Sequence, residues 1–299
     1  MLISLVIPFN VTYAQNSYIH KESIGKSTTP SVIKKEAFAF YPISSWVGKR
    51  FIFLPSPKSL QKSGYQSFKG GDGEYGHPSY NKYVGRIAKV VSVNKEQSLY
   101  NVQFVMEDDG HRLTATAYSE NIWDIALIAD IDNARSKWLD KTLWYAGNKL
   151  VTYNEDTEKF GSVNVKKYLP VKVTDIVLGW FEHQPIRFIL QTSSGKEGFR
   201  DINLSGTNTS NRLRDNVRFK DYFLTKDPRK TYKWPDKVWS SIERESVFIG
   251  MTAKQARMGW GKPKTINKTT SNNTISEQWV YSSGSYLYFE NGVLTTIQN

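Results

Sequence analysis

The final part of the chain, residues 235–299, contains the signals that restrict the fold most. Thr252 stands three residues before Gln255, and this spacing predicts a capping box in which each side chain bonds to the other residue's backbone N–H. Met251, directly before the cap, can pack on Ala256, and Gly261 ends the helix about two turns later. Thr252 and Gln255 are therefore expected to have a structural role.

A first helix is expected to begin at Pro235, because proline is well suited to the first helical position. It should end near Ser246. Val238, Trp239 and Ile242 then lie on one face, and this apolar face is expected to pack against a sheet.

Three strands are expected after a polar loop at 265–276. They are placed at 277–281, 285–290 and 293–298. Asn291-Gly292 is the strongest hairpin signal of the chain, because these residue types accept the positive φ angles of a two-residue turn. Residues 235–299 thus predict a helix-helix-three-strand (ααβββ) domain.

The expected register decides which side chains share a face of this sheet. A four-residue loop at 282–285 pairs Trp279 with Tyr288, and the Asn-Gly turn pairs Phe289 with Leu294. The face toward the helices is then expected to hold Val280, Leu287, Phe289 and Leu294. The other face is expected to hold Trp279, Tyr281, Tyr286, Tyr288, Thr295 and Ile297.

Four aromatic residues on that second face are the candidates for partner binding. They are Trp279, Tyr281, Tyr286 and Tyr288. Trp and Tyr combine a large apolar area with a polar tip and are enriched in interaction hot spots. The sequence leaves open whether this face is exposed or covered by the preceding part of the chain.

Four short motifs occur in order in residues 249–292 and resemble a known family. They are Ile249-Gly-Met-Thr-x-x-Gln255, Trp260-Gly-x-Pro263, Glu277-Gln-Trp-Val-Tyr281 and Tyr286-Leu-Tyr-Phe-x-Asn-Gly292. Together they resemble the SmpA/OmlA domain of envelope lipoproteins and the fold shared with β-lactamase-inhibitor proteins. The resemblance implies an envelope or secreted protein that binds other proteins through its open sheet face. The chain has no cysteine that could be acylated, so the resemblance does not extend to lipid anchoring.

A weak internal repeat is visible between about residues 38 and 230. Trp46 and Trp138 each open a W-x-x-K-x-hydrophobic segment, and alternating strand patterns follow both copies. Gly110 and Gly195 lie in the hairpin turns that close these patterns. Each copy resembles a small bacterial SH3-like barrel, at 38–130 and 131–230. The expected fold class is therefore mainly β, with two SH3-like barrels followed by an α+β domain.

The amino-terminal residues predict export. Residues 1–14 form an apolar run that ends in Thr12-Tyr-Ala14, which is typical of a signal peptide with a cleavage site before Gln15. Because a basic segment does not precede the run, either the true start of the protein lies upstream of Met1 or the run is a buried strand; a signal peptide is favoured. Residues 15–37 are polar, rich in Ser and Thr and without periodicity, so they are expected to form a flexible leader.

Composition restricts the possible chemistry. The chain contains no cysteine, which excludes thiolate catalysis, disulfides and cysteine-ligated metals. His20, His77, His111 and His183 are scattered and show no metal-binding or catalytic spacing. The glycine-rich segment 69–77 has neither the P-loop nor the dinucleotide-binding spacing and is interpreted as a solvated loop. No catalytic residue, metal or cofactor is expected, nor is a membrane-spanning segment.

The net charge of +12 indicates attraction to an anionic partner. We expect a non-catalytic, exported binding protein of the cell envelope, periplasmic or secreted, whose partner is an envelope protein or an anionic cell-wall polymer. The alternative is a cytoplasmic nucleic-acid-binding protein built on basic barrels. It is less favoured because the basic residues are dispersed along the chain.

Overall fold

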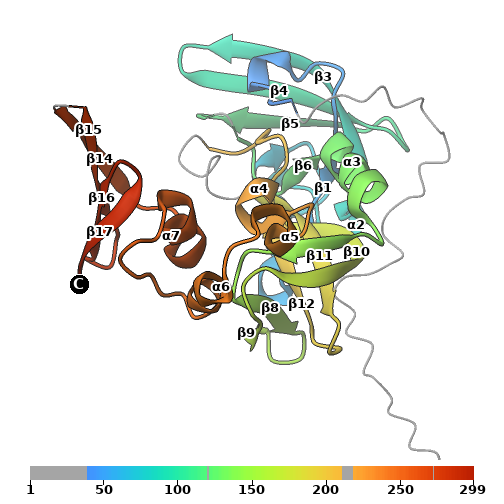
Figure 1. The fold of residues 1–299 in the computed structure, drawn as a ribbon. Coiled ribbons are helices and arrows are strands. Elements are labelled where there is room, and N and C mark those ends of the chain that lie inside the picture. Colours follow the sequence, from blue (N-terminus) through green and yellow to red (C-terminus); the bar gives the residue numbers. More distant parts are fainter. Residues whose placement is uncertain (1–38, 120, 211–217, 272) are drawn as a thin grey trace, which may run out of the picture.

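The computed structural model describes residues 39–119, 121–210, 218–271 and 273–299. The predicted signal peptide at 1–14 and leader at 15–37 lie outside these residues. The described chain is mainly β, with three antiparallel sheets. Figure 1 shows the first two sheets forming the body of the molecule and the third projecting from one side. In the described residues, no helix has both the length and the apolar character needed to cross a membrane.

The first sheet has six strands in the order β2-β5-β4-β3-β1-β6. The strands are β1 Arg50–Phe53, β2 Phe68–Lys69, β3 Ile87–Glu96, β4 Leu99–Met106, β5 Arg112–Ala117 and β6 Ile125–Leu127. Short helical turns lie between them at η1 Ile43–Ser45, α1 Lys58–Gln61, η2 Glu74–Gly76 and α2 Tyr80–Tyr83. Aromatic residues dominate the core of this unit, where Trp46 packs on Phe51 and Phe51 on Phe104.

The second sheet has seven strands in the order β13-β7-β10-β11-β12-β8-β9. The strands are β7 Thr142–Tyr145, β8 Lys149–Asn154, β9 Lys159–Asn164, β10 Leu169–Phe181, β11 Gln184–Thr192, β12 Glu197–Ile202 and β13 Phe223–Leu224. The helices of this part are α3 Ile128–Trp138, α4 Phe219–Tyr222 and α5 Pro228–Tyr232.

Five strands of each sheet follow the same order, which agrees with the internal repeat. Strands β5-β4-β3-β1-β6 of the first sheet correspond in order to β12-β11-β10-β7-β13 of the second. The repeated tryptophans occupy equivalent places, because Trp46 precedes β1 and Trp138 precedes β7, and both are buried. Gly110 and Gly195 lie in the predicted turns and have positive φ angles of 73° and 79°.

The two units are joined by a shared core and by a buried polar segment. Ile52 and Ala126 of the first sheet pack with α3 and the second sheet. The domain boundary expected between residues 130 and 131 falls inside α3, which packs in this shared core. Asn208, from the second unit, donates a side-chain hydrogen bond to the carbonyl oxygen of Ile122 at 2.8 Å and accepts one from its N–H at 2.7 Å. Such paired polar groups fix the two units to each other.

The carboxy-terminal part contains two helices and four strands. The helices are α6 Asp236–Glu243 and α7 Ala253–Trp260, and the strands are β14 Thr265–Ser271, β15 Thr274–Val280, β16 Tyr286–Glu290 and β17 Val293–Gln298. Their order in the sheet is β14-β15-β16-β17. In Figure 1 this sheet is the outermost layer, and α6 and α7 lie between it and the body.

The predicted three-strand layout is wrong in one respect. Residues 265–276 were expected to form a polar loop, but they contain β14 and the beginning of β15, so the domain is ααββββ. Every residue of β14 is exposed, because β14 is an edge strand that extends beyond the helices. Such a strand lacks the apolar alternation that reveals a half-buried one.

Candidate functional site

The register of β15 and β16 decides what the carboxy-terminal sheet presents to solvent. Trp279 lies opposite Leu287, and Gln278 lies opposite Tyr288. The ring of Trp279 is 4.5 Å from that of Phe289, centroid to centroid, and the Trp279 residue is only 2% exposed. The prediction that Trp279 lies on the free face is therefore wrong. It belongs to the face that packs on α6 and α7.

The turn between β15 and β16 explains this difference. The Tyr281 N–H donates to the Ser285 carbonyl oxygen at 3.0 Å, and the Gly284 N–H donates to the Tyr281 carbonyl oxygen at 3.1 Å. Gly284 has a φ angle of +87°. The loop therefore contains three residues with glycine in a left-handed conformation, and the expected four-residue loop is not formed. A shift of one residue moves every side chain of a strand to the other face.

Tyr281 also lies on the inner face, two residues beyond Trp279. Its ring packs edge-on against Trp260 at the end of α7, with centroids 5.3 Å apart and an angle of 89° between the planes. Its hydroxyl donates to the carbonyl oxygen of Gly261 at 3.3 Å, and burial raises the pKa of this phenol to about 12. Of the four aromatic candidates, two are thus inside, and Tyr286 and Tyr288 are on the outer face.

A row of hydrogen-bonded polar side chains crosses the outer face of the sheet. The Asn267 amide donates to Gln278 Oε1 at 2.9 Å, and Gln278 Nε2 donates to the Tyr288 hydroxyl at 3.1 Å. The Tyr288 hydroxyl donates in turn to Gln298 Oε1 at 2.9 Å. We call Asn267, Gln278, Tyr288 and Gln298 the polar row, one residue from each strand. Sequence reasoning found only Tyr288 among them.

The turn between β16 and β17 begins as predicted and then departs from the expected register. Asn291 and Gly292 both have positive φ angles, 49° and 79°, and Phe289 pairs with Leu294. A bulge then shifts the pairing, and the hydroxyl of Thr295 donates to the Tyr288 carbonyl oxygen at 3.2 Å. As a result Ile297 lies opposite Leu287 and packs with the inner core, contrary to the predicted outer position.

The predicted capping box at the start of α7 is confirmed. The Thr252 N–H donates to Gln255 Oε1 at 2.8 Å, and the Gln255 N–H donates to Thr252 Oγ1 at 3.3 Å. Met251 and Ala256 are both fully buried, as expected of the apolar contact beside the cap. The Gly250 N–H donates to the carbonyl oxygen of Leu294 at 2.8 Å, which fixes the start of the helix to β17.

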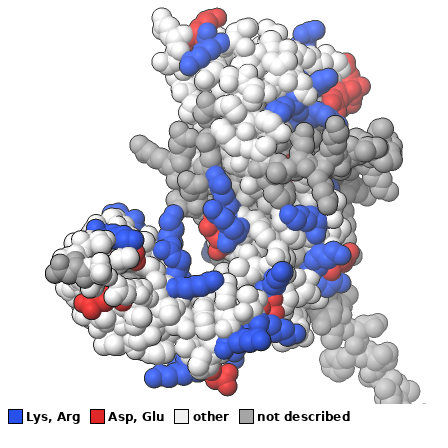
Figure 2. Space-filling model, turned by 45° about the horizontal axis from the view of Figure 1, so that its top comes forward, with Lys and Arg blue, Asp and Glu red and all other residues white. Residues whose placement is uncertain are grey.

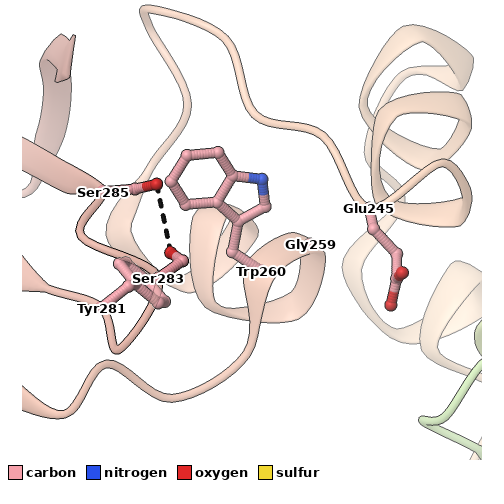
Figure 3. Close-up of a pocket in the computed structure, with 6 residues that line it drawn as sticks. All are labelled: Glu245, Gly259, Trp260, Tyr281, Ser283 and Ser285. Atoms are coloured by element: carbon pink, nitrogen blue, oxygen red, sulfur yellow. Dashed lines mark hydrogen bonds between the residues drawn. The ribbon is translucent and has the colours of Figure 1, made fainter. Parts of the chain in front are cut away.

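A small pocket lies at the other end of α7. It has a volume of about 260 Å³. Its lining residues are Glu245, Gly259, Trp260, Tyr281, Ser283 and Ser285. Figure 3 shows the indole of Trp260 standing between the two serines on one side and Glu245 on the other. The Ser283 hydroxyl donates to Ser285 Oγ at 3.1 Å.

The pocket adjoins the seam between the carboxy-terminal domain and the second sheet. Lys167 Nζ donates to the Gly259 carbonyl oxygen at 2.6 Å and lies 3.4 Å from Glu245 Oε1. The amide of Asn148 donates to Glu245 Oε2 at 2.7 Å. Burial lowers the pKa of Lys167, and the nearby Glu245 opposes this shift. Cations stabilise the carboxyl ends of helices, so Lys167 fastens the end of α7 to the loop after β9.

Two of the histidines, His77 and His111, and the glycine-rich segment have structural partners. His77 Nδ1 lies 2.8 Å from the carbonyl oxygen of Phe68, and His111 Nε2 contacts that of Gly70. These contacts fasten the segment 69–77 to the first sheet. The residues that the structure describes contain no group of three His, Asp or Glu side chains that could hold a metal ion.

Comparison of the chain with protein-family models, with curated proteins and with solved structures found no match. The likenesses to the SmpA/OmlA domain and to SH3-like barrels therefore stay predictions from motifs and strand patterns.

Proposed function

We propose that this chain is a non-catalytic binding protein whose carboxy-terminal domain holds a protein partner on the outer face of β14–β17. The polar row is the observation that supports the proposal most directly. It spans all four strands of a sheet whose other face already packs on α6 and α7. Tyr286 and Tyr288 lie among the side chains of this face and remain partner-binding candidates.

The position of the sheet supports this use of its outer face. The domain contacts the second unit from the helix side, where Lys166 pairs with Glu243 at 3.4 Å and the ring of Tyr168 packs edge-on near Trp239. Within the described residues the outer face lies on the side away from this seam (Figure 1). The three amides and the Tyr288 hydroxyl of the row hold one another in place, so less side-chain entropy is lost when a partner binds.

The finer parts of the proposal rest on resemblance. The ααββββ domain extends the SmpA/OmlA-like pattern by one edge strand, and members of that family bind proteins through an open sheet face. The common strand order of the first two sheets supports tandem SH3-like modules. The apolar run at 1–14 supports export to the periplasm or beyond the cell, with an envelope protein or anionic cell-wall polymer as partner.

The charge distribution favours a protein partner over nucleic acid. In Figure 2 the Lys and Arg side chains occur on both lobes, with Asp and Glu side chains beside several of them. Arg86, for example, pairs with both Asp108 and Asp109 at 2.6 Å. A protein that follows a nucleic-acid backbone is expected to gather its basic residues along one face or groove.

Affinity capture from native cell envelopes tests the proposal. The bait is the full chain, compared with its Tyr288→Ala and Gln278→Ala variants. We expect one protein to be captured by the parent chain and to be lost, or weakened by about tenfold or more, with either variant. Tyr75→Ala is the matched control, because Tyr75 is a 78% exposed tyrosine in the first unit. Equal capture by all variants, or equal loss with Tyr75→Ala, would refute the proposed surface.

A further inference from the structure

The pocket at the end of α7 has the size and place of a binding site for one small ring. Its volume of about 260 Å³ is below the roughly 300–1,000 Å³ typical of pockets for drug-sized ligands and cofactors. It lies where the carboxy-terminal domain meets the second sheet, since its wall residue Glu245 is bonded to Asn148. Domain seams are preferred positions for ligand sites.

The pocket combines one aromatic surface with polar groups on two sides. Trp260 and Tyr281 supply the aromatic surface and hold each other in an edge-to-face contact. The negative face of an aromatic ring attracts the slightly positive hydrogens of C–H groups. Hydroxyls of Ser283 and Ser285 lie on one side of the indole, and the carboxylate of Glu245 lies on the other (Figure 3).

A free hydrogen-bond donor also borders the pocket. Trp260 Nε1 has no hydrogen-bond partner within the described part of the chain, and Figure 3 shows this nitrogen on the side of Glu245. The hydrogen of the Ser285 hydroxyl is likewise available, because Ser285 Oγ accepts from Ser283. A ligand is thus offered both donors and acceptors around an apolar face.

The charge of the pocket is balanced. Among the described residues that line it, Glu245 is the only charged one, and Lys167 lies 3.4 Å from the carboxylate. The Asn148 amide occupies a further acceptor position of Glu245 at 2.7 Å. A cationic ligand would compete with Lys167, and an anionic ligand would meet Glu245. A neutral ligand with several hydroxyls avoids both costs.

From this combination we infer that the pocket binds a single neutral sugar ring, stacked on Trp260 and hydrogen-bonded to Ser285, Glu245 and the indole N–H. The inference goes beyond the proposed function, because the polar row does not line this pocket. Its success or failure is therefore independent of capture by the outer sheet face.

Titration of the ¹⁵N-labelled full chain tests the inference through the tryptophan indole N–H signals. The probes are N-acetylglucosamine, methyl glucopyranoside and methyl galactopyranoside, with tetramethylammonium as a cation and glucuronate as an anion. Trp260→Phe identifies the Trp260 signal. We expect at least one neutral sugar to shift it saturably, with a dissociation constant of about 1 mM, a typical strength for so few ligand atoms.

Variants separate a real site from weak contact with any exposed ring. We expect Ser285→Ala, followed by the Trp260 signal, and Trp260→Phe, followed by the backbone amide signals of Ser283 and Ser285, to weaken sugar binding at least threefold. Trp123→Phe, which alters a 62% exposed tryptophan of the first unit, should leave it unchanged. Binding that is unaffected by Ser285→Ala and Trp260→Phe overturns the inference. The inference is also overturned if no sugar shifts the Trp260 signal at about 100 mM. It is overturned as well if either charged probe shifts this signal at a lower concentration than the neutral sugars do.

Discussion

The two faces of the carboxy-terminal sheet differ in how their side chains are held. On the inner face Trp279, Leu287 and Phe289 are buried in a mainly apolar core against helices α6 and α7, where the indole N–H of Trp279 also donates to Glu277 Oε2 at 3.0 Å. On the outer face Gln278 and Tyr288 are half-buried and held by hydrogen bonds within the polar row. Neighbouring residues of one strand therefore differ in role: one stabilises the core, and we propose that the next contributes to recognition.

This contrast shows that residue type alone does not identify which face of a small sheet is open to a partner. Trp279 has the residue type most typical of hot spots, yet it belongs to the core. Gln278 is less typical, but it lies on the open face. The face of each residue follows from the register, and the register follows from the length of one turn.

Replacement of the core tryptophan should have the largest effect. Trp279→Ala removes a large buried side chain and should lower the stability of the carboxy-terminal domain by about 3–5 kcal/mol. Amide hydrogen exchange of β15 and β16 measures this loss locally, which suits a chain of several units. Gln278→Ala, one residue away on the outer face, is the control. Similar losses of protection in both variants would contradict the assignment of the faces.

A change in the turn between β15 and β16 should have an intermediate effect on stability. Gly284→Ala places a side chain at a φ angle of +87°, although no atom lies within 4 Å of the added carbon. The cost is therefore conformational, and we expect about 1–2 kcal/mol. Thermal unfolding and exchange of β15 and β16 measure it. Ser282→Ala, in the same loop, should be nearly neutral, and an equal effect of the two changes would speak against the left-handed glycine.

The smallest effect on stability is expected on the outer face. Tyr288→Phe removes the hydroxyl that links Gln278 to Gln298 but keeps the ring. We expect the free energy of unfolding to change by about 0.5 kcal/mol or less, as for most surface substitutions, while partner binding weakens. Equilibrium unfolding of the variant measures its stability, and titration of the same preparation with the partner measures the loss of binding. A large loss of stability would place Tyr288 with the inner face.

Local signals in the sequence were sufficient for the two helices of the carboxy-terminal domain and for its Asn-Gly turn, but they did not predict α3. The spacing of Thr252 and Gln255 predicts the capping box because both bonds form within four residues. Asn291-Gly292 predicts its two-residue turn because few other residue pairs accept the required φ angles. These features depend on neighbouring residues only.

The edge strand and the faces of the sheet could not be read in the same way. Strand β14 has polar residues on both sides, so its alternation is lost, and only its β-branched residues Thr265, Ile266, Thr269 and Thr270 hint at a strand. The segment 282–285 is compatible with a loop of three or four residues, and the choice reverses the face of Trp279. The residues that hold Glu245 at the edge of the pocket, Lys167 and Asn148, are distant from it in sequence, so local signals could not predict these contacts.

A pair of introduced cysteines tests the register most directly, because the chain has none of its own. Gln278 and Tyr288 lie opposite each other, so Gln278→Cys with Tyr288→Cys should place the two Cα atoms within the about 4.4–6.8 Å that a disulfide spans. Glu290→Cys with Val293→Cys is the positive control, since these residues pair in either register. The account predicts that mild oxidation joins both pairs. If oxidation joins residues 290 and 293 but not residues 278 and 288, then residues 278 and 288 lie on opposite faces of the sheet, and the register described above is contradicted.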